Sequence, residues 1–206
     1  MNQKLKGSLM MIASAILFGS MPLFVKNIYL GGANAISVVF YRNFLALPVL
    51  FFIMVKTSEE PLMVQREEIP KFFIVSSIGA TLTPILMYMS YNYIDSAMST
   101  TLHYINPIVV FLILRIFYQE RLNRLKAFCL AATTFGILLF YTPGAPANAW
   151  GIFLALASGV TFAIYIVYLD KSGLSKMNPF RFSFYNALFC SVLVLVYALL
   201  TKSFTY

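Results

Sequence analysis

The residues of this chain that could do chemistry lie inside long apolar stretches. Arg42 is a single charge within one stretch, and Asp95, Ser99, His103 and Asn106 recur along another at intervals of four, four and three. On a helix that turns about 100° per residue, these four side chains fall on one face. Such a polar face suits the binding of a polar solute, and it equally suits hydrogen bonds between neighbouring membrane helices. The spacing alone leaves both interpretations open.

Asp95, Ser99 and His103 also contain the residue types of a hydrolytic triad. On a helix, however, Asp95 lies eight residues and ~12 Å along the axis from His103, too far to orient its imidazole. We therefore expect no enzyme, with an intramembrane hydrolase that uses Asn106 or another helix as the weaker alternative. A single histidine cannot supply a two-histidine metal site, and both cysteines lie in apolar stretches. No metal and no cofactor are expected.

The composition places the chain in a membrane. It has 206 residues, of which 60% are hydrophobic and 11% charged, whereas a soluble domain has about 25% charged residues. Seven apolar stretches, each long enough to cross a ~30 Å hydrocarbon layer as a helix, lie near 8–28, 36–55, 72–92, 96–117, 125–142, 150–169 and 180–200. The remaining loops are too short for a soluble catalytic domain, and no Gly-x-x-x-x-Gly-Lys-Ser/Thr phosphate-binding loop occurs.

The net charge of +8 follows the membrane topology. With the N-terminus in the cytoplasm, the outward segments carry Lys26 and Lys202, Arg42 lies within a span, and the other lysines and arginines face inward. This asymmetry predicts a multi-pass protein of the cytoplasmic (inner) membrane, with the N-terminus inside and the C-terminus of this chain outside. We expect the lipid bilayer as a partner, and no nucleic acid.

Counting residues along the spans places several polar groups at one depth. Arg42 lies about six residues, or ~9 Å, into its span; it either snorkels or forms a structural ion pair, or it lines a polar cavity. His103 lies ~12 Å below Asp95 and so near the depth of Arg42. Tyr88 reaches that level from the other direction, on a face of the third span that also carries Thr81.

A shift of the sequence by 144 residues aligns the sixth span with the first and the seventh with the second. It pairs Gly7 with Gly151, Phe18 with Phe162, Asn34 with Asn178, and Phe40-Tyr41 with Phe184-Tyr185. One copy thus holds five spans. Because five is odd, the second copy enters from the opposite face, which is the inverted repeat of many secondary transporters. Tyr165, in the sixth span, is expected at the interface between the copies.

The chain resembles the EamA-type family of the drug/metabolite transporter superfamily. The resemblance is carried by Phe18-Gly19-Ser20-Met21-Pro22, Tyr41-Arg42-Asn43-Phe44-Leu45, Asn106-Pro107-Ile108-Val109, Gln119-Glu120-Arg121-Leu122 and Gly136. Among these, Pro107, Glu120 and Gly136 are expected as signature or structural positions: a kink, a carboxylate near a helix N-terminus and a close-packing residue. Two departures are His103, where the family usually has a small or apolar residue, and a second repeat that stops after two of five spans.

The resemblance implies an all-α polytopic membrane protein of about seven transmembrane helices. One complete five-helix EamA repeat occupies residues 1–142, an outer linker 143–149, and the first two helices of an inverted second repeat 150–206. Two full copies would need about 290 residues, so the expectation is seven-tenths of a transporter.

The implied function is secondary transport, as export of a small metabolite or drug-like compound across the cell membrane. The candidate residues of the expected substrate pathway all lie within the spans: Arg42, Thr81, Tyr88, Ser99, His103, Asn106 and Tyr165. Arg42 would attract an anionic group, and His103, with an ordinary pKa of about 6.5, would couple transport to protons. The alternative is a truncated, non-transporting protein, or a subunit that needs a second chain, such as a homodimer, to complete the fold.

Overall fold

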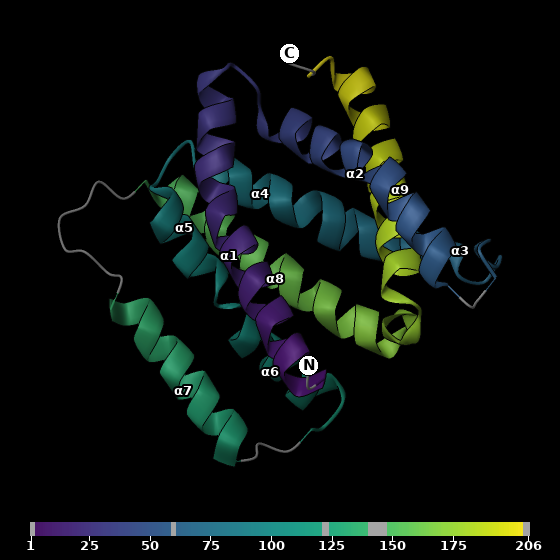
Figure 1. Ribbon diagram of the computed structural model, residues 1–206. Helices are drawn as coiled ribbons and strands as arrows, with labels where there is room; N and C mark the ends of the chain where they lie inside the picture. The colour runs from purple at the N-terminus through teal and green to yellow at the C-terminus, as the bar shows by residue number, and fades with distance from the viewer. Residues whose placement is uncertain (1–2, 59–60, 121–123, 140–147, 204–206) are drawn as a thin grey trace.

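The computed structural model describes residues 3–58, 61–120, 124–139 and 148–203, and every regular element within them is helical. The helices are α1 (Gln3–Leu30), α2 (Ala35–Thr57), α3 (Ile69–Val75), the π-helix η1 (Ser76–Leu82), α4 (Thr83–Ser90), α5 (Ser96–His103), α6 (Asn106–Phe117), α7 (Arg124–Leu139), α8 (Ala149–Lys171), the 3-10 turn η2 (Leu174–Lys176) and α9 (Pro179–Thr201). Figure 1 shows α7 set apart from the other helices, which pack together.

Six helical segments of the described residues are long and apolar enough to cross a membrane. They are 7–30, 35–57, 69–90, 96–117, 149–171 and 179–201. The predicted all-α polytopic membrane protein is therefore confirmed. The fifth expected span corresponds to α7, of which 16 residues are described. Its expected end at 142, and most of the linker 143–149, lie outside the described residues.

The third span is continuous but is not an α-helix throughout. Pro84 has no N–H, so the carbonyl of Ala80, four residues earlier, loses its usual intrahelical donor. The Cys190 thiol of α9 lies 3.3 Å from this carbonyl and donates to it. The Thr83 hydroxyl likewise donates to Ile78 O at 2.8 Å, inside the π-helix η1. The proline thus explains why the span widens locally and why α9 contacts it there.

The fourth span is broken by the same mechanism. Helix α5 ends at His103, a turn follows at 104–105, and α6 begins with Asn106 and Pro107. Pro107 leaves the carbonyl of His103 without a backbone donor, and the Asn106 side-chain amide donates to it at 3.0 Å. The span therefore consists of two half-helices, and Asn106 supplies the hydrogen bond that the His103 carbonyl lacks at the break between them.

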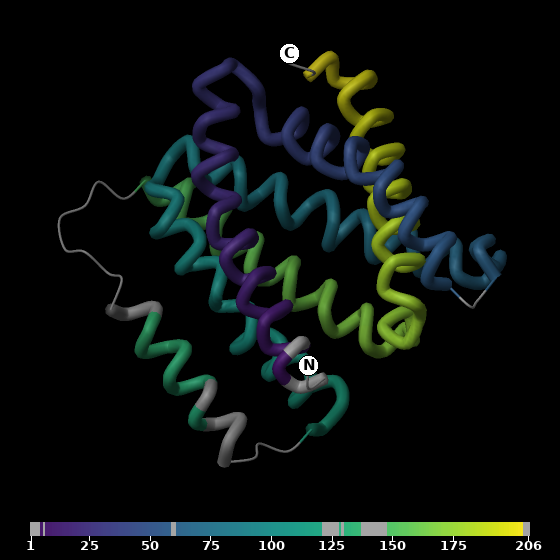
Figure 2. The backbone as a smooth tube through the Cα atoms, in the orientation of Figure 1, coloured from purple at the N-terminus to yellow at the C-terminus, as the bar shows by residue number. Residues whose placement is uncertain are grey.

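Helices α2 and α9 pack against each other in opposite directions (Figures 1 and 2). Asn34 caps the start of α2 and donates to the carbonyl of Ser203, just beyond the end of α9, at 2.6 Å. Asn178 caps the start of α9 and donates to the carbonyl of Thr57, at the end of α2, at 3.1 Å. The two asparagines aligned by the 144-residue shift thus make reciprocal contacts.

A buried ion pair fixes the segment that follows α2. Arg181, whose side chain is 4% exposed, contacts a Glu68 carboxylate oxygen at 3.0 Å and the carbonyl of Met63 at 2.8 Å. The Tyr185 hydroxyl donates to the carbonyl of Leu62 at 2.6 Å. The loop between α2 and α3 is therefore held against the start of α9 by several polar contacts.

We predict that Arg181→Gln lowers the free energy of unfolding by about 3 kcal/mol, because it leaves the Glu68 carboxylate largely buried without its cation. Denaturant titration of the purified protein in detergent, followed by circular dichroism, measures the effect. Lys26→Gln is the matched control. It removes the Lys26–Asp95 pair, whose side chains are 43% and 65% exposed, and such a pair contributes under about 1 kcal/mol. Equal losses in the two variants would contradict the prediction.

Candidate functional site

Arg42 lies on α2, partly buried and inside a membrane-spanning segment. Its Nη1 donates to the Tyr88 hydroxyl at 2.9 Å and contacts Met21 Sδ at 3.9 Å. The guanidinium carbon lies 5.9 Å from the centroid of the Tyr88 ring. Within the described part of the chain, no carboxylate forms an ion pair with Arg42. Its charge is therefore held by a phenol and a thioether, which do not neutralise it.

Tyr88 is 3% exposed and belongs to α4, which follows the π-helix η1 in the continuous third span. Its backbone carbonyl accepts a hydrogen bond from the Tyr29 hydroxyl of α1 at 3.0 Å. Its own hydroxyl also contacts Met21 Sδ at 3.7 Å. Helices α1 and α4 thus both determine where the partner of Arg42 lies.

His103 is the last residue of α5 and is 5% exposed. Its Nδ1 lies 2.8 Å from the Ser158 hydroxyl of α8, and that hydroxyl donates to the carbonyl of Ala155 at 2.6 Å. Because a serine hydroxyl has one proton, this network assigns Nδ1–H as the donor to Ser158. A neutral ring then carries its acceptor at Nε2.

Gly159 allows α8 to approach the break in the fourth span. A Cβ at this position would lie 2.7 Å from the His103 carbonyl oxygen and 2.7 Å from Ile105 Cγ2. Since real Cβ atoms do not come this close to backbone, glycine is required for the observed contact. Gly79 has the same role in η1, where a Cβ would lie 2.1 Å from the ring of Tyr165.

Arg42, Tyr88 and His103 line one cavity of about 140 Å³. The other lining residues come from α1, η1, α4, α5, α8 and the turns after α4 and α5. They are Phe18, Gly19, Met21, Pro22, Gly79, Thr83, Pro84, Met87, Tyr91, Thr100, Tyr104 and Phe162. Arg42, Tyr88 and His103, which the sequence predicts to lie at one depth in the membrane, thus line the same cavity. The arrangement offers a cation, a phenol and an imidazole to a solute inside a membrane span.

The other predicted pathway residues make contacts between or within helices. The Thr81 hydroxyl donates to Cys190 Sγ at 3.2 Å. Ser99 is fully buried and hydrogen-bonds to the Ser90 hydroxyl, and Asn106 satisfies the His103 carbonyl as described above. Tyr165 packs on Gly79. None of these four is among the described residues that line the Arg42 cavity.

Asp95 does not share the environment of the buried residues on α5. It caps the helix by accepting from Ala97 N at 2.8 Å, and it pairs with Lys26 of α1 at 2.9 Å. The hydrogen bond from Lys26 and that from the Ala97 amide lower the pKa of the Asp95 carboxyl below its ordinary value. Asp95 therefore joins α1 to α5 and does not contact His103.

Of the three signature positions, Pro107 lies at the break in the fourth span, Glu120 lies between α6 and α7, and Gly136 lies on α7. Pro107 opens α6, and both Pro107 and Gly136 line a second, larger cavity of about 650 Å³ between α1, the fourth span and α7. The Glu120 carbonyl accepts from Arg115 Nη1 at 3.5 Å. Residues 121–123, which follow Glu120, lie outside the described residues. Thr100, Thr101 and Tyr104, which also line the larger cavity, were not singled out from the sequence, although the hydroxyl-rich run after Asp95 is a signal for them.

Apolar helices thus surround a cavity lined by Arg42, which forms no ion pair with any carboxylate of the described residues, and the fold is that of a multi-pass membrane protein. The sequence profile of the EamA-like transporter family matches residues 5–142, so the chain belongs to that family. An uncharacterized transporter of Archaeoglobus fulgidus is 29% identical over 195 residues, which cover 94% of this chain and 67% of the relative. A second uncharacterized transporter of that organism is 29% identical over 116 residues, or 56% of this chain and 41% of the relative. The family and these relatives identify a membrane transporter.

We predict that Gly159→Ala destabilises the protein by about 1–3 kcal/mol, since its Cβ forces α8 away from the break at His103. The control is Gly7→Ala on α1, where a Cβ meets nothing within 4 Å and the gain in helix propensity is up to about 1 kcal/mol. Thermal unfolding in detergent compares the two. A Gly159→Ala variant as stable as Gly7→Ala would show that the close contact is not needed.

Proposed function

We propose that this transporter exports a small organic anion by secondary transport, and that the Arg42 cavity is part of its pathway. The supporting observation is that the Arg42 guanidinium lies inside a span and that its polar contacts among the described residues are with the Tyr88 hydroxyl and Met21 Sδ. A charge in a membrane span costs about 2.5–3.5 kcal/mol on insertion scales. If Arg42 had only a structural role, we would expect it to pair with a carboxylate, which would offset that cost. If Arg42 binds the substrate, its charge stays available for the substrate.

A carboxylate is the anionic group that suits this site best. A guanidinium has five N–H donors in a planar fork that matches a carboxylate, and the contacts described above involve only Nη1. The Tyr88 hydroxyl beside Arg42 is a further donor of the same cavity, and the His103 imidazole, which also lines it, donates from Nε2 to a carboxylate only when its ring is protonated. Ser99, which lies against Ser90, supports the position of α5 and is not placed in direct contact with the solute by this proposal.

The proposed domain organisation keeps the first repeat at 1–142, the outer linker at 143–149 and a partial inverted second repeat at 150–206. The reciprocal contacts of Asn34 and Asn178 support it, because an inverted repeat relates α2 and α9 by a pseudo-two-fold axis. The His103–Ser158 hydrogen bond then joins the two repeats at the cavity. The basic residues at the ends of the spans support a cytoplasmic N-terminus in the inner membrane and a C-terminus of this chain outside.

We predict that Arg42→Gln weakens the binding and transport of a small carboxylate by about 10- to 100-fold, which corresponds to the loss of one charge-assisted hydrogen bond. Thermal shift of the purified chain with a panel of carboxylates and their matching amides identifies a ligand. Uptake of that ligand into inside-out vesicles then measures export. Arg42→Lys, which keeps the charge, is the control and should retain more activity than Arg42→Gln.

The proposal is wrong if amides and carboxylates stabilise the wild type equally, or if Arg42→Gln leaves transport of the carboxylate unchanged. Uptake into right-side-out vesicles only would overturn the direction of transport and leave the role of Arg42 standing.

Proton coupling through His103 is a separate part of the proposal, supported by the position of its ring in the cavity of Arg42. We predict that carboxylate flux in wild-type vesicles increases with an imposed pH gradient, and that His103→Gln removes this response while binding persists. Flux at equal pH on both sides is the control. A His103→Gln variant that still responds normally to the gradient would exclude His103 as the coupling group.

A further inference from the structure

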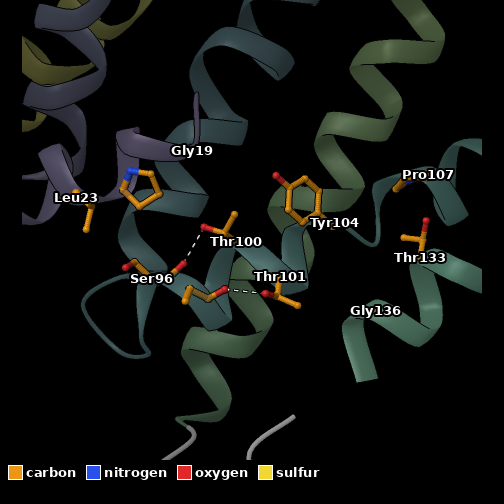
Figure 3. Close-up of a pocket in the computed structure, with 11 residues that line it drawn as sticks. Gly19, Leu23, Ser96, Thr100, Thr101, Tyr104, Pro107, Thr133 and Gly136 are labelled. Atoms are coloured by element: carbon orange, nitrogen blue, oxygen red, sulfur yellow. Dashed lines mark hydrogen bonds between the residues drawn. The ribbon is translucent and has the colours of Figure 1, made fainter. Parts of the chain in front are cut away.

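The Arg42 cavity shares a wall with the larger cavity of about 650 Å³. Gly19 and Pro22 of α1, Thr100 of α5 and Tyr104 of the following turn line both. In Figure 3, Tyr104 lies between Gly19 on α1 and Thr133 and Gly136 on α7. A molecule that extends past this wall would therefore contact both cavities.

The two cavities differ in their chemistry. The described residues that line the larger one carry no charge, and they present mostly apolar surface from glycine, proline, leucine, alanine and threonine. Thr100 Oγ1 donates to the carbonyl of Ser96 at 2.7 Å, and Thr101 Oγ1 donates to that of Ala97 at 2.8 Å (Figure 3). Because each hydroxyl proton is used inside α5, these threonines can accept hydrogen bonds from a ligand but have no second proton to donate.

The size of the larger cavity is that of a small-molecule site, since ligand pockets have volumes of about 300–1,000 Å³. The Arg42 cavity alone, at about 140 Å³, is below that range. A small charged group fits there, but a drug-like body does not. The body of a larger substrate would need the adjacent space.

We propose, on the basis of the proposed function, that the substrate is an amphiphilic organic monoacid whose carboxylate lies at Arg42 and whose uncharged body occupies the cavity between α1, the fourth span and α7. Donor groups on the body, such as N–H or O–H, find acceptors at Thr100 and Thr101. Gly19 and Tyr104 lie where the charged and uncharged parts of the substrate join, and they therefore set the length and width that the site accepts.

A third cavity, of about 340 Å³, also touches Arg42 and Tyr88 and offers the competing place for the body. It lies between α1 and α2 and is lined by Phe24 and Leu45, which are 63% and 68% exposed. Helix α5 contributes none of its described lining residues, so the threonine acceptors are absent from it. An acyl chain of a membrane lipid suits this groove better than a body with donor groups.

The test compares binding of butanoate and decanoate to the purified full chain in detergent, with saturable binding of the radiolabelled acids as the readout. Each methylene that enters the apolar cavity should raise affinity by about fourfold until the cavity is filled. Gly19 lines both cavities, and a Cβ there meets nothing within 4 Å, so the indole of Gly19→Trp has room at the shared wall. Because Gly19 also lines the Arg42 cavity, we expect this variant to weaken the binding of both acids, with a loss for decanoate at least tenfold greater than that for butanoate.

Matched variants separate this effect from unfolding and from the third cavity. Gly7→Trp places the same side chain on α1 at another position where a Cβ meets nothing within 4 Å, and it should bind both acids normally. Gly136→Trp fills the larger cavity from α7 and should reproduce the loss for decanoate if Gly19→Trp does not fold. Leu45→Trp, in the third cavity, should leave the dependence on chain length unchanged.

The inference is overturned if decanoate affinity falls in Leu45→Trp and not in Gly19→Trp or Gly136→Trp, or if affinity does not rise with chain length in the wild type. In both cases the proposed function stands as long as Arg42→Gln weakens butanoate binding. If Arg42→Gln binds butanoate as well as the wild type does, or if no acid binds saturably, the proposed function itself fails.

Discussion

The structure depends on one constraint, which is that a carbonyl freed inside a membrane span must find a donor within the protein. Pro84 and Pro107 each free such a carbonyl. For Ala80 the donor is the thiol of Cys190 on α9, and for His103 it is the side chain of Asn106. These two contacts stabilise interruptions of the α-helical hydrogen-bonding pattern that would otherwise cost free energy in the apolar interior of the membrane. The interruptions in turn bring Tyr88 and His103, which flank them, to the same cavity.

Helix α8 packs against both interrupted spans, and glycine permits the contact at each. Gly79 in η1 receives the ring of Tyr165, and Gly159 in α8 receives the carbonyl of His103. Ser158, next to Gly159, then holds the imidazole by a hydrogen bond. The position of His103 is thus determined jointly by the break at Pro107, by the close approach of α8 and by the Ser158 hydroxyl. Asn106, by contrast, supports the break through its hydrogen bond to the His103 carbonyl.

The sequence predicted the spans and the shared level of Arg42, Tyr88 and His103 because helix rise converts residue number into depth. It did not predict which polar groups pair across the bundle. Glu68 and Arg181 lie 113 residues apart, and their contact depends on how α3 packs against α9. The widening of the third span at η1 and the larger cavity behind Thr100 and Tyr104 also depend on packing, which periodicity does not encode. The reciprocal caps at Asn34 and Asn178 show how a weak sequence repeat corresponds to a specific structural relation.

A comparison of Arg181, which is buried, with Arg42, which is partly buried, separates a structural role of an arginine from a binding role. Arg181 is paired with the carboxylate of Glu68 and with a loop carbonyl, so its charge is neutralised and its contacts hold an element in place. Arg42 is paired with a phenol and a thioether, so its field extends into the adjoining cavities. The degree of burial does not tell which arginine keeps its charge available, since Arg181 is the more buried of the two and yet is the one paired with a carboxylate. The identity of the partner does, because an ion pair consumes the charge that a transporter would need for an anionic solute, whereas a neutral hydrogen-bond partner orients the guanidinium and leaves that charge available.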